Sequence, residues 1–244
     1  MADKLRHDGR RLGELRDVAI TAGFVSTADG SCLFELGKTR VICTASFDED
    51  VPAWRANSGL GWVTAEYGML PASTGKRKRR PIGKPDSRGV EIQRIIGRVL
   101  RSVVRFDRLG QNTITLDCDV LEADGGTRTA AITGAYVALC LAVENAAARG
   151  LCKPKVVEGA VAAASVGVVQ GRAMLDLDYV EDSEAEVDMN VAMTSAGKFV
   201  EIQGSSERKP FDLAQLQAML NLARRGMRKL ARAQRQAIKD AKRS

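Results

Sequence analysis

The sequence predicts an α+β fold, in which strand-rich stretches and long helices follow one another along the chain. Residues 17–48 alternate between apolar and polar side chains and contain two turn signals, as in a meander of short strands. Three later segments place their apolar residues at helical spacing, and a second strand-rich region covers 155–207. Because strands followed by a helix occur twice, we expect two similar halves that share one core.

The composition indicates a compact globular protein with an acidic partner. The chain has 244 residues, of which 45% are hydrophobic and 27% charged, so we expect a single domain over 1–244 with a sizeable core. Its formal net charge of +7 makes nucleic acid the leading candidate partner. Aromatic residues make up only 5%, which argues against a module that reads single strands mainly by stacking bases on rings.

Cysteine and histidine usage argues against several kinds of site. The five cysteines are odd in number, widely spaced and without a CxxC pair, so we interpret them as small buried residues of a cytoplasmic protein. A single histidine, His7, argues against Ser-His-Asp catalysis, Cys-His catalysis and histidine-ligated zinc. The N-terminus lacks the apolar core of a signal peptide, and the longest uncharged apolar window, 129–143, is too short to span a bilayer.

A basic loop and an arginine-bearing helix are predicted in the middle of the chain. The loop at 76–84 carries six Lys and Arg residues among Pro and Gly, and we expect it to be mobile. The helix at 89–106 has one apolar face, and a strand at 112–123 follows it. Four arginines are expected to form one stripe on the opposite face of this helix, namely Arg94, Arg98, Arg101 and Arg105.

The second half of the chain begins with a long apolar helix from about 127 to 148. In the strand-rich region that follows, Gly171 and Gly197 mark two hairpins. A last helix begins at Asp212 with one apolar face, and its basic end, from about 232 to 244, is expected to be mobile.

The stretch "EADGGTRTAA" at 122–131 joins a predicted strand to a predicted helix and has the features of an anion site. Its two glycines allow a sharp turn, and the first amides of a helix point outward without partners. With Thr127 and Arg128 beside them, these amides could bind a phosphate. An ordinary tight turn with a solvated arginine is the alternative.

Positive charge gathers in the segment 76–108, which contains twelve basic and three acidic residues. A basic loop joined to an arginine-bearing helix could follow a polyphosphate backbone. A solvated helix face beside a flexible loop is the alternative interpretation.

Negative charge gathers farther along, where the residues between 172 and 198 include seven Asp and Glu but no basic residue. We interpret this segment as a hairpin, with Asp182 and Asp188 flanking the turn and with Asp176 and Asp178 on one strand face. A divalent cation such as Mg²⁺, which prefers one or two carboxylates plus water and phosphate oxygens, would neutralise it. An exposed acidic hairpin without a metal is the alternative.

Together these features suit chemistry on a phosphodiester without a histidine base. Inorganic phosphate is already ionised at pH 7 and can itself be the nucleophile. Positioning and charge neutralisation would then lower the barrier, as is general for phosphoryl transfer.

Seven blocks of the sequence, in order and at the expected spacing, resemble the signatures of the ribonuclease PH family of phosphorolytic 3′ exoribonucleases. The resemblance covers about residues 5 to 235. Exosome ring subunits and the halves of polynucleotide phosphorylase share the fold but match these blocks less closely. Notably specific are the blocks with the Glu-Ile-Gln-Arg helix, "RGVEIQRIIGRVLRSV", and with Asp-Gly-Gly-Thr-Arg-Thr, "DCDVLEADGGTRTAAITGAYVAL"; "DLDYVEDSEAEVDMNVAMT" is another of the seven.

This resemblance implies a ribosomal-protein-S5-domain-2-like α+β fold with two βαβ-type halves and a hexameric ring built as a trimer of dimers. It also implies an enzyme of the tRNA nucleotidyltransferase type, which trims the 3′ ends of tRNA precursors and other RNAs, including ribosomal RNA. Inorganic phosphate is the co-substrate and Mg²⁺ the cofactor, nucleoside diphosphates are released, and the reaction is reversible. Neither DNA nor a membrane is expected as a partner.

The resemblance further implies which residues form the site. Family phosphate ligands fall on Arg88, Gly126, Thr127 and Arg128. The paired catalytic or metal-binding aspartates fall on Asp182 and Asp188.

The basic loop departs from the family pattern, because "LPASTGKRKRRPIGKPDSR" is shorter and concentrates its charge at 76–80. Individual RNA contacts therefore cannot be transferred to it. As a group, we expect RNA to contact Arg77, Arg79 and Arg80 of the loop together with Arg94 and Arg98 of the helix.

Two other classes of function stay open at this point. A non-catalytic ring subunit would bind RNA without cleaving it, although the retained Arg88, Arg128, Asp182 and Asp188 argue against this class. A Mg²⁺-dependent hydrolytic nuclease would release monophosphates and would not need the anion site.

Overall fold

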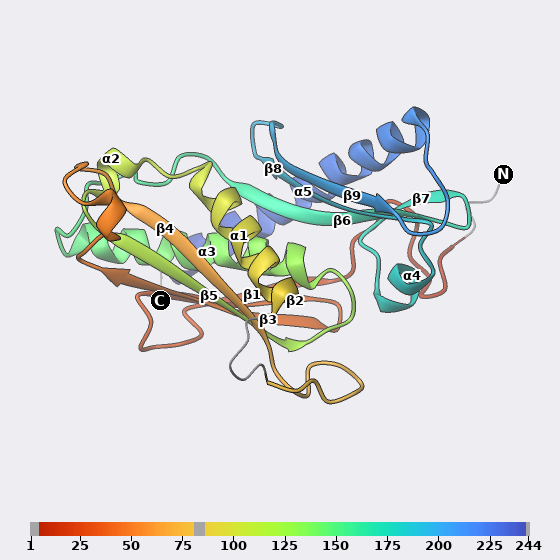
Figure 1. Cartoon of the computed structure of the whole chain (residues 1–244), viewed down its shortest axis with the longest axis horizontal. Coiled ribbons are helices and arrows are strands. Elements are labelled where there is room, and N and C mark those ends of the chain that lie inside the picture. The colour runs from red at the N-terminus through yellow and green to blue at the C-terminus, as the bar shows by residue number, and fades with distance from the viewer. Residues whose placement is uncertain (1–4, 81–85, 243–244) are drawn as a thin grey trace.

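The computed structural model describes residues 5–80 and 86–242, and it confirms the α+β class as two sheets around a central helix (Figure 1). Helix α3 (Thr127–Ala148) contacts both sheets. Helix α1 (Ser87–Arg101) packs on the first sheet, and α5 (Leu213–Ala241) packs on the second. One apolar core therefore spans residues from both halves of the chain.

The first sheet has the strand order β1-β2-β3-β5-β4. Strands β1, β2, β3 and β5 pair antiparallel, so the predicted meander at 17–48 is confirmed. Strands β4 and β5 pair in parallel and are joined through α1, which makes a βαβ unit. The strands are β1 (Val18–Ala22), β2 (Gly30–Leu36), β3 (Thr39–Asp48), β4 (Trp62–Met69) and β5 (Thr113–Glu122).

The second sheet has the strand order β7-β6-β8-β9, and its paired strands are all antiparallel. It consists of β6 (Val161–Val169), β7 (Arg172–Leu175), β8 (Val187–Thr194) and β9 (Phe199–Ser206). The predicted hairpins at Gly171 and Gly197 are present, and both glycines have positive φ. A short helix, α4 (Tyr179–Glu184), joins β7 to β8, but both strands pair with β6 and not with each other, so neighbouring parallel strands occur among the described strands in the first half only.

Helix α3 occupies the centre of the fold, at the bounds that the sequence predicts. Sixteen of its 22 residues are buried, and they lie on every side of the helix. A helix that is apolar all round must be covered all round, here by β2, β3 and β5 on one side and by β6 and α5 on another. By length and composition α3 could also cross a membrane, but its burial within the fold is that of a core helix.

The cysteines are part of the core, as predicted. Cys32, Cys43 and Cys118 lie side by side on three neighbouring strands beneath α3, and Cys140 lies on α3 itself. These four are buried and Cys152 is half-buried; all five are free thiols. Neighbouring thiols and burial raise the pKa of Cys43 well above its usual value, which keeps it protonated and inert.

Helix α1 ends at Arg101, so the predicted helix to residue 106 is wrong over its last residues. Val104 forms a bridge with Val157, and the amide of Arg105 donates to the carbonyl of Val156 at 2.7 Å. Pairing with the segment before β6 thus replaces the last turn of the helix. A separate turn, α2 (Phe106–Leu109), follows.

The predicted stripe of four arginines is reduced to two by this change. Arg101 lies with its guanidinium 4.6 Å from the ring centroid of Trp62 and donates to a backbone carbonyl. Arg105 has left the helix and pairs with two carboxylates. Arg94 and Arg98 remain on the exposed face of α1.

The acidic segment at 176–188 does not form the predicted hairpin. It contains α4, whose N-cap Asp178 accepts the amide of Glu181 at 3.0 Å. The spacing of Asp178 and Glu181 is a capping box, a helix-start signal that an alternating interpretation overlooks. Asp176 is buried with a φ of 57°, so Asp176 and Asp178 do not share a strand face.

The cations that pair with this acidic segment come from the N-terminal part of the chain. Arg6 forms a two-pronged ion pair with Glu181, and Arg16 forms another with Asp176. These ion pairs neutralise Asp176 and Glu181 without the divalent cation that we expected for the segment. Asp182 and Asp188 have no such partner among the described residues.

Helix α5 continues to Ala241, so residues 232–241, expected to be mobile, are helical. Gln234 is buried and donates to the carbonyls of Thr133 and Val161, and Ala237 is buried as well. Packing against α3 and β6 thus holds the basic end of this helix in place. Residues 243–244 lie outside the described residues.

Replacing Arg6 tests the importance of the N-terminal cations. Its side chain is completely buried, and it also donates to the carbonyls of Leu175 and Asp176. Arg6→Ala would remove the two-pronged pair of the buried Glu181 and leave it the Asp178 amide at 3.2 Å and a longer contact to Arg10 at 3.6 Å. We therefore expect the free energy of unfolding in urea to fall by up to about 3–5 kcal/mol. Arg11→Ala, at a side chain that is 69% exposed, is the control and should change it by less than about 0.5 kcal/mol. Equal losses for both variants would contradict the assignment.

Candidate active site

Two glycines form the turn between β5 and α3. Gly125 and Gly126 both have positive φ, 76° and 68°, in the region where glycine carries no steric penalty. Gly126 is the N-cap of α3 and has no side chain to accept the first amides of the helix. These amides, at the positive end of a 22-residue helix, are available to an anion.

This turn touches the chain that leads into α4. A Cβ at Gly125 would lie 2.6 Å from the carbonyl oxygen of Leu177, so only glycine permits the contact. Arg16 reinforces it, because one guanidinium donates to the carbonyl of Gly125 at 3.3 Å and to both carboxylate oxygens of Asp176, at 2.7 and 3.1 Å. These contacts hold the Gly125–Gly126 turn, in the first half of the chain, against the acidic segment 176–188 of the second half.

Arg128, in the first turn of α3, is positioned by side chains of two other elements. It donates to Gln203 of β9 and lies 3.6 Å from Glu91 of α1, and Gln203 in turn donates to Glu91 at 2.6 Å. Its Nε is buried and has no hydrogen-bond partner in the part of the chain that the structure describes. A buried donor without a partner is costly, and a bound oxyanion would satisfy it.

Thr127 is held from the side of β4. The Tyr67 hydroxyl donates to Thr127 Oγ1 at 2.9 Å, and burial raises the pKa of Tyr67, so that it stays a donor at neutral pH. The Thr127 hydroxyl proton is therefore free to point toward an anion at the helix end.

A cavity of about 450 Å³ opens beside this helix end. Arg88, from the first turn of α1, reaches it without an ion pair to any of the described acidic residues. Asp182 of α4, Asp188 of β8 and Glu207 line the same cavity. Glu91 and Arg208 line it as well, so cations and carboxylates from five elements or their ends meet in one cavity.

The charged forms of Asp182 and Asp188 are unfavourable in this cavity, because both side chains are partly buried and lie near other carboxylates. Burial, then repulsion by Asp182, raises the pKa of Asp188 to about 6, against the opposing effect of Arg128. Burial also raises the pKa of Asp182, which Arg88 opposes and Glu207 reinforces. Hard carboxylate oxygens in a cavity with room for water and phosphate fit a Mg²⁺ ion.

Comparisons with known proteins decide the family. Models of the 3′ exoribonuclease family match residues 14–143 with domain 1 and residues 159–226 with domain 2. Ribonuclease PH of Bifidobacterium longum is 54% identical over 238 residues, which are 96% of each chain. Ribonuclease PH of Neisseria meningitidis serogroup C is 52% identical over 234 residues, 95% of this chain and 97% of that one. This chain belongs to the ribonuclease PH family.

Solved structures confirm the ribonuclease PH fold. Rice Rrp46 has a TM-score of 0.78 at 15% identity and covers 96% of this chain with all of its own. A chain of the Archaeoglobus fulgidus exosome, in a structure with RNA bound to the active site, has a TM-score of 0.79 at 21% identity. It covers 93% of this chain and 92% of its own.

The structure brings together the phosphate and carboxylate residues that the resemblance implies, but not all of the expected RNA contacts. Arg94 and Arg98 line a different cavity, of about 270 Å³, with Trp62. Arg98 is paired with Glu201 at 3.0 Å. These two arginines therefore lie along α1, away from the phosphate residues.

The basic loop reaches the rim of the site. Arg77, Arg79 and Arg80 are exposed, and Lys78 forms an ion pair of 2.7 Å with Asp86, the N-cap of α1. Asp86 stands two residues before Arg88, so the first part of the loop is tied next to the cavity. The rest of the loop, 81–85, lies outside the described residues.

Several site residues of this ribonuclease PH family member were missed from the sequence. Tyr67 and Glu91 stand within blocks that carry the resemblance, which was the one available signal for them. Gln203, Glu207 and Arg208, at β9 and its end, also stand within a block that carries the resemblance. The pairing of β9 with β8 brings Glu207 and Arg208 to the cavity and Gln203 to Arg128.

The stability of the protein at different pH values tests the raised pKa of Asp188. The pKa of Asp188 in the folded protein, about 6, is above that of an unfolded aspartate, so its stabilising contribution is full in acid and is lost as the pH rises through 6. With a chelator at pH 8, Asp188→Asn should therefore be more stable than the wild type by about 1–3 kcal/mol, and the difference should shrink at pH 5. Mg²⁺ should then stabilise the wild type but not the variant.

The control for this measurement is Asp17→Asn, at an exposed carboxylate outside the cavity, which should show neither effect. A less stable Asp188→Asn at pH 8 in chelator would contradict the description of this pair.

Proposed function

We propose that this cavity performs the phosphorolytic 3′ exoribonuclease reaction that trims the ends of tRNA precursors. The observation that carries the proposal is the buried, unpartnered Nε of Arg128 beside the open amides of α3. That arrangement suits a small oxyanion, and the carboxylates that line the same cavity could hold a divalent cation that neutralises a second phosphate group. Inorganic phosphate and a terminal phosphodiester are the two groups that the reaction must bring together.

The phosphate would be bound by one arginine that is held in place and one that is free to move. Arg128 is fixed by Gln203 and Glu91, whereas Arg88 is exposed and free to close over the anion. The amides after Gly126 and the hydroxyl of Thr127 would set its orientation. One phosphate oxygen is then held in position to attack the last phosphorus of the RNA.

The attack forms a new P–O bond and breaks the bond between phosphorus and the 3′-oxygen of the preceding nucleotide. The 3′-oxygen takes up a proton and leaves as a hydroxyl, so that the products are a nucleoside diphosphate and an RNA shorter by one nucleotide. Asp182 and Asp188 would hold a Mg²⁺ ion, which supplies charge neutralisation for the scissile phosphate when it is bound. The reverse reaction adds a nucleotide.

The assembly and the location are part of the same proposal. Strand β9 is an edge of its sheet, and its Phe199 and Ile202 side chains are 42% and 46% exposed. Exposed apolar residues on an unpaired edge favour association with another subunit. We propose a ring-shaped hexamer in the cytoplasm; the neighbours of the same fold from archaeal exosomes support an assembly of several subunits.

Product analysis tests the activity, and Arg128 tests the site. With a labelled RNA tail and Mg²⁺, we expect nucleoside diphosphates only when phosphate is present. Arg128→Ala should raise the KM for phosphate about 10- to 100-fold, the value of one or two charge-assisted hydrogen bonds, and Arg128→Lys should restore part of it. Arg105→Ala is the control, because this exposed arginine pairs with Asp107 and Glu158 and does not line the cavity.

Three outcomes would contradict the proposal. Monophosphates released without phosphate would indicate a hydrolytic nuclease, and the absence of any cleavage would indicate a non-catalytic ring subunit. An Arg128→Ala variant with an unchanged KM for phosphate would refute the assignment of the anion site.

The basic loop makes a separate prediction for a single-stranded RNA tail. If Arg77, Arg79 and Arg80 each contact a phosphate, changing all three to Ala should lower the slope of log affinity against log salt by about 2. The control changes Arg105, Arg108 and Lys153 to Ala near α2, at the other end of α1, and should leave the slope unchanged. A loop variant with the slope of the wild type would rule out these contacts.

A further inference from the structure

A line of cations runs along one face of α5, far from the site described above. They recur at intervals of three or four residues and therefore share a face over about 27 Å. All are exposed. They are Arg224, Arg228, Arg232, Arg235, Lys239 and, just after the helix, Lys242.

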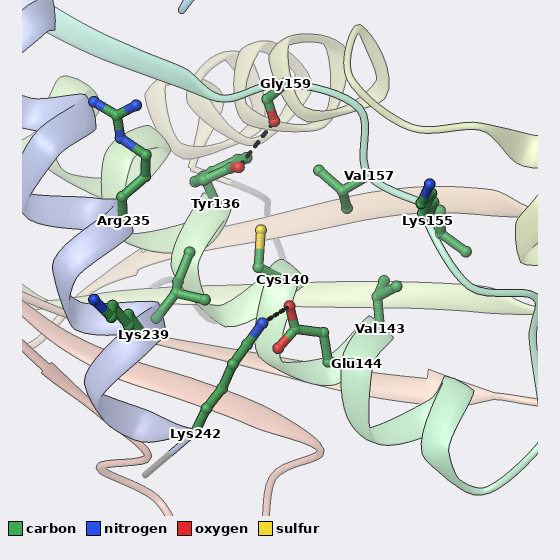
Figure 2. Close-up of a pocket in the computed structure, with 12 residues that line it drawn as sticks. Tyr136, Cys140, Val143, Glu144, Lys155, Val157, Gly159, Arg235, Lys239 and Lys242 are labelled. Carbon is green, nitrogen blue, oxygen red and sulfur yellow. Dashed lines mark hydrogen bonds and ion pairs between the residues drawn. The ribbon is translucent and has the colours of Figure 1, made fainter.

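This face is hollowed rather than convex. One cavity, of about 500 Å³, lies between α5 and the turn from β8 to β9. A second, of about 430 Å³, lies between α5, α3 and the segment 155–159. Figure 2 shows Lys242 reaching Glu144 of α3, with Arg235 and Lys239 on the preceding turns of α5. Arg235 lines both cavities, so they lie next to each other along α5 and are together called the α5 groove here.

The charge of the α5 groove is almost uncompensated. Lys155 adds a further cation, and the one acidic residue that lines either cavity is Glu144, which is already paired with Lys242 at 2.8 Å (Figure 2). The other five cations of α5 make no ion pair with an acidic side chain of the described residues. Such an array binds polyanions, and like charge opposes the stacking of two copies of this face on each other.

The lining also indicates which part of an RNA would fit. The one aromatic residue in either cavity is Tyr136, which is buried and donates to the carbonyl of Gly159 at 2.9 Å (Figure 2). The groove thus has no ring on which an unpaired base could stack. Duplex RNA, by contrast, is recognised through its phosphates and 2′-hydroxyls.

We propose that the α5 groove binds the double-stranded stem of the RNA whose 3′ end lies in the active site. The inference rests on the proposed function for its substrate. Along the buried helix α3, Cys140 of the groove lies about 18 Å from Arg128 of the active site, which is the length of about five stacked nucleotides. A stem held in the groove would therefore need an unpaired tail of at least that length, which passes over the surface to reach the phosphate.

Two double variants on the same helix test this inference. Arg228→Ala/Arg232→Ala removes two cations of the groove, and Arg225→Ala/Lys229→Ala removes two exposed cations that line neither cavity. Binding is measured without phosphate, so that no RNA is degraded, for a hairpin with a short 3′ tail and for the tail alone. We expect the groove variant to bind the hairpin about tenfold or more weakly at 0.1 M salt, with a salt slope lower by about 2, and to bind the tail normally. The control should bind both RNAs like the wild type.

Three results would overturn the proposal: unchanged affinity for the hairpin, an equal loss for the hairpin and the tail, or an equal loss in the control. A change in the mass of the assembly in the groove variant would assign the face to a subunit contact instead. Loss of binding to polyglutamate without loss of the hairpin would assign it to an acidic protein. Phosphorolysis of the tail alone tests the proposed function separately, because the wild type should release diphosphates from it whether or not the groove binds a stem.

Discussion

The contact between Arg16 and Asp176 holds the two halves of this protein in the arrangement that makes a site. Both side chains are buried, at 7% and 2% exposure, and the guanidinium also reaches the carbonyls of the turn before α3. Burial works to lower the pKa of Arg16, but the carboxylate of Asp176 outweighs it, so the pair stays charged. Two buried charges are tolerated because nearly every donor has an acceptor.

The position of the chemistry follows from this contact. Arg88 and Arg128 come from the starts of α1 and α3 in the first half, and Asp182 and Asp188 come from α4 and β8 in the second. Neither half has all four residues. Gly125 permits the close approach of the two segments and Arg16 fixes it, so that the proposed phosphate and carboxylate residues line one cavity.

Much of this was predictable from the sequence, and the failures have physical causes. Local signals were sufficient for α3, which is apolar throughout, and for the glycine turn at its start. At 176–188 two local signals disagreed: alternation suggested a strand, but the capping box of Asp178 and Glu181 starts a helix. Local signals also failed for residues 102–106, where pairing with a distant segment replaces the helix, and for Gln203, which only sheet pairing brings to Arg128.

The most direct test of the account is a crystal structure with sulfate and Mn²⁺, which stand in for phosphate and Mg²⁺. We predict sulfate within hydrogen-bond distance of Arg128 Nε and the first amides of α3, and an anomalous Mn²⁺ peak between Asp182 and Asp188 in the same cavity. Sulfate bound elsewhere with the Arg128 Nε still unpartnered, or a metal far from this pair of aspartates, would contradict it.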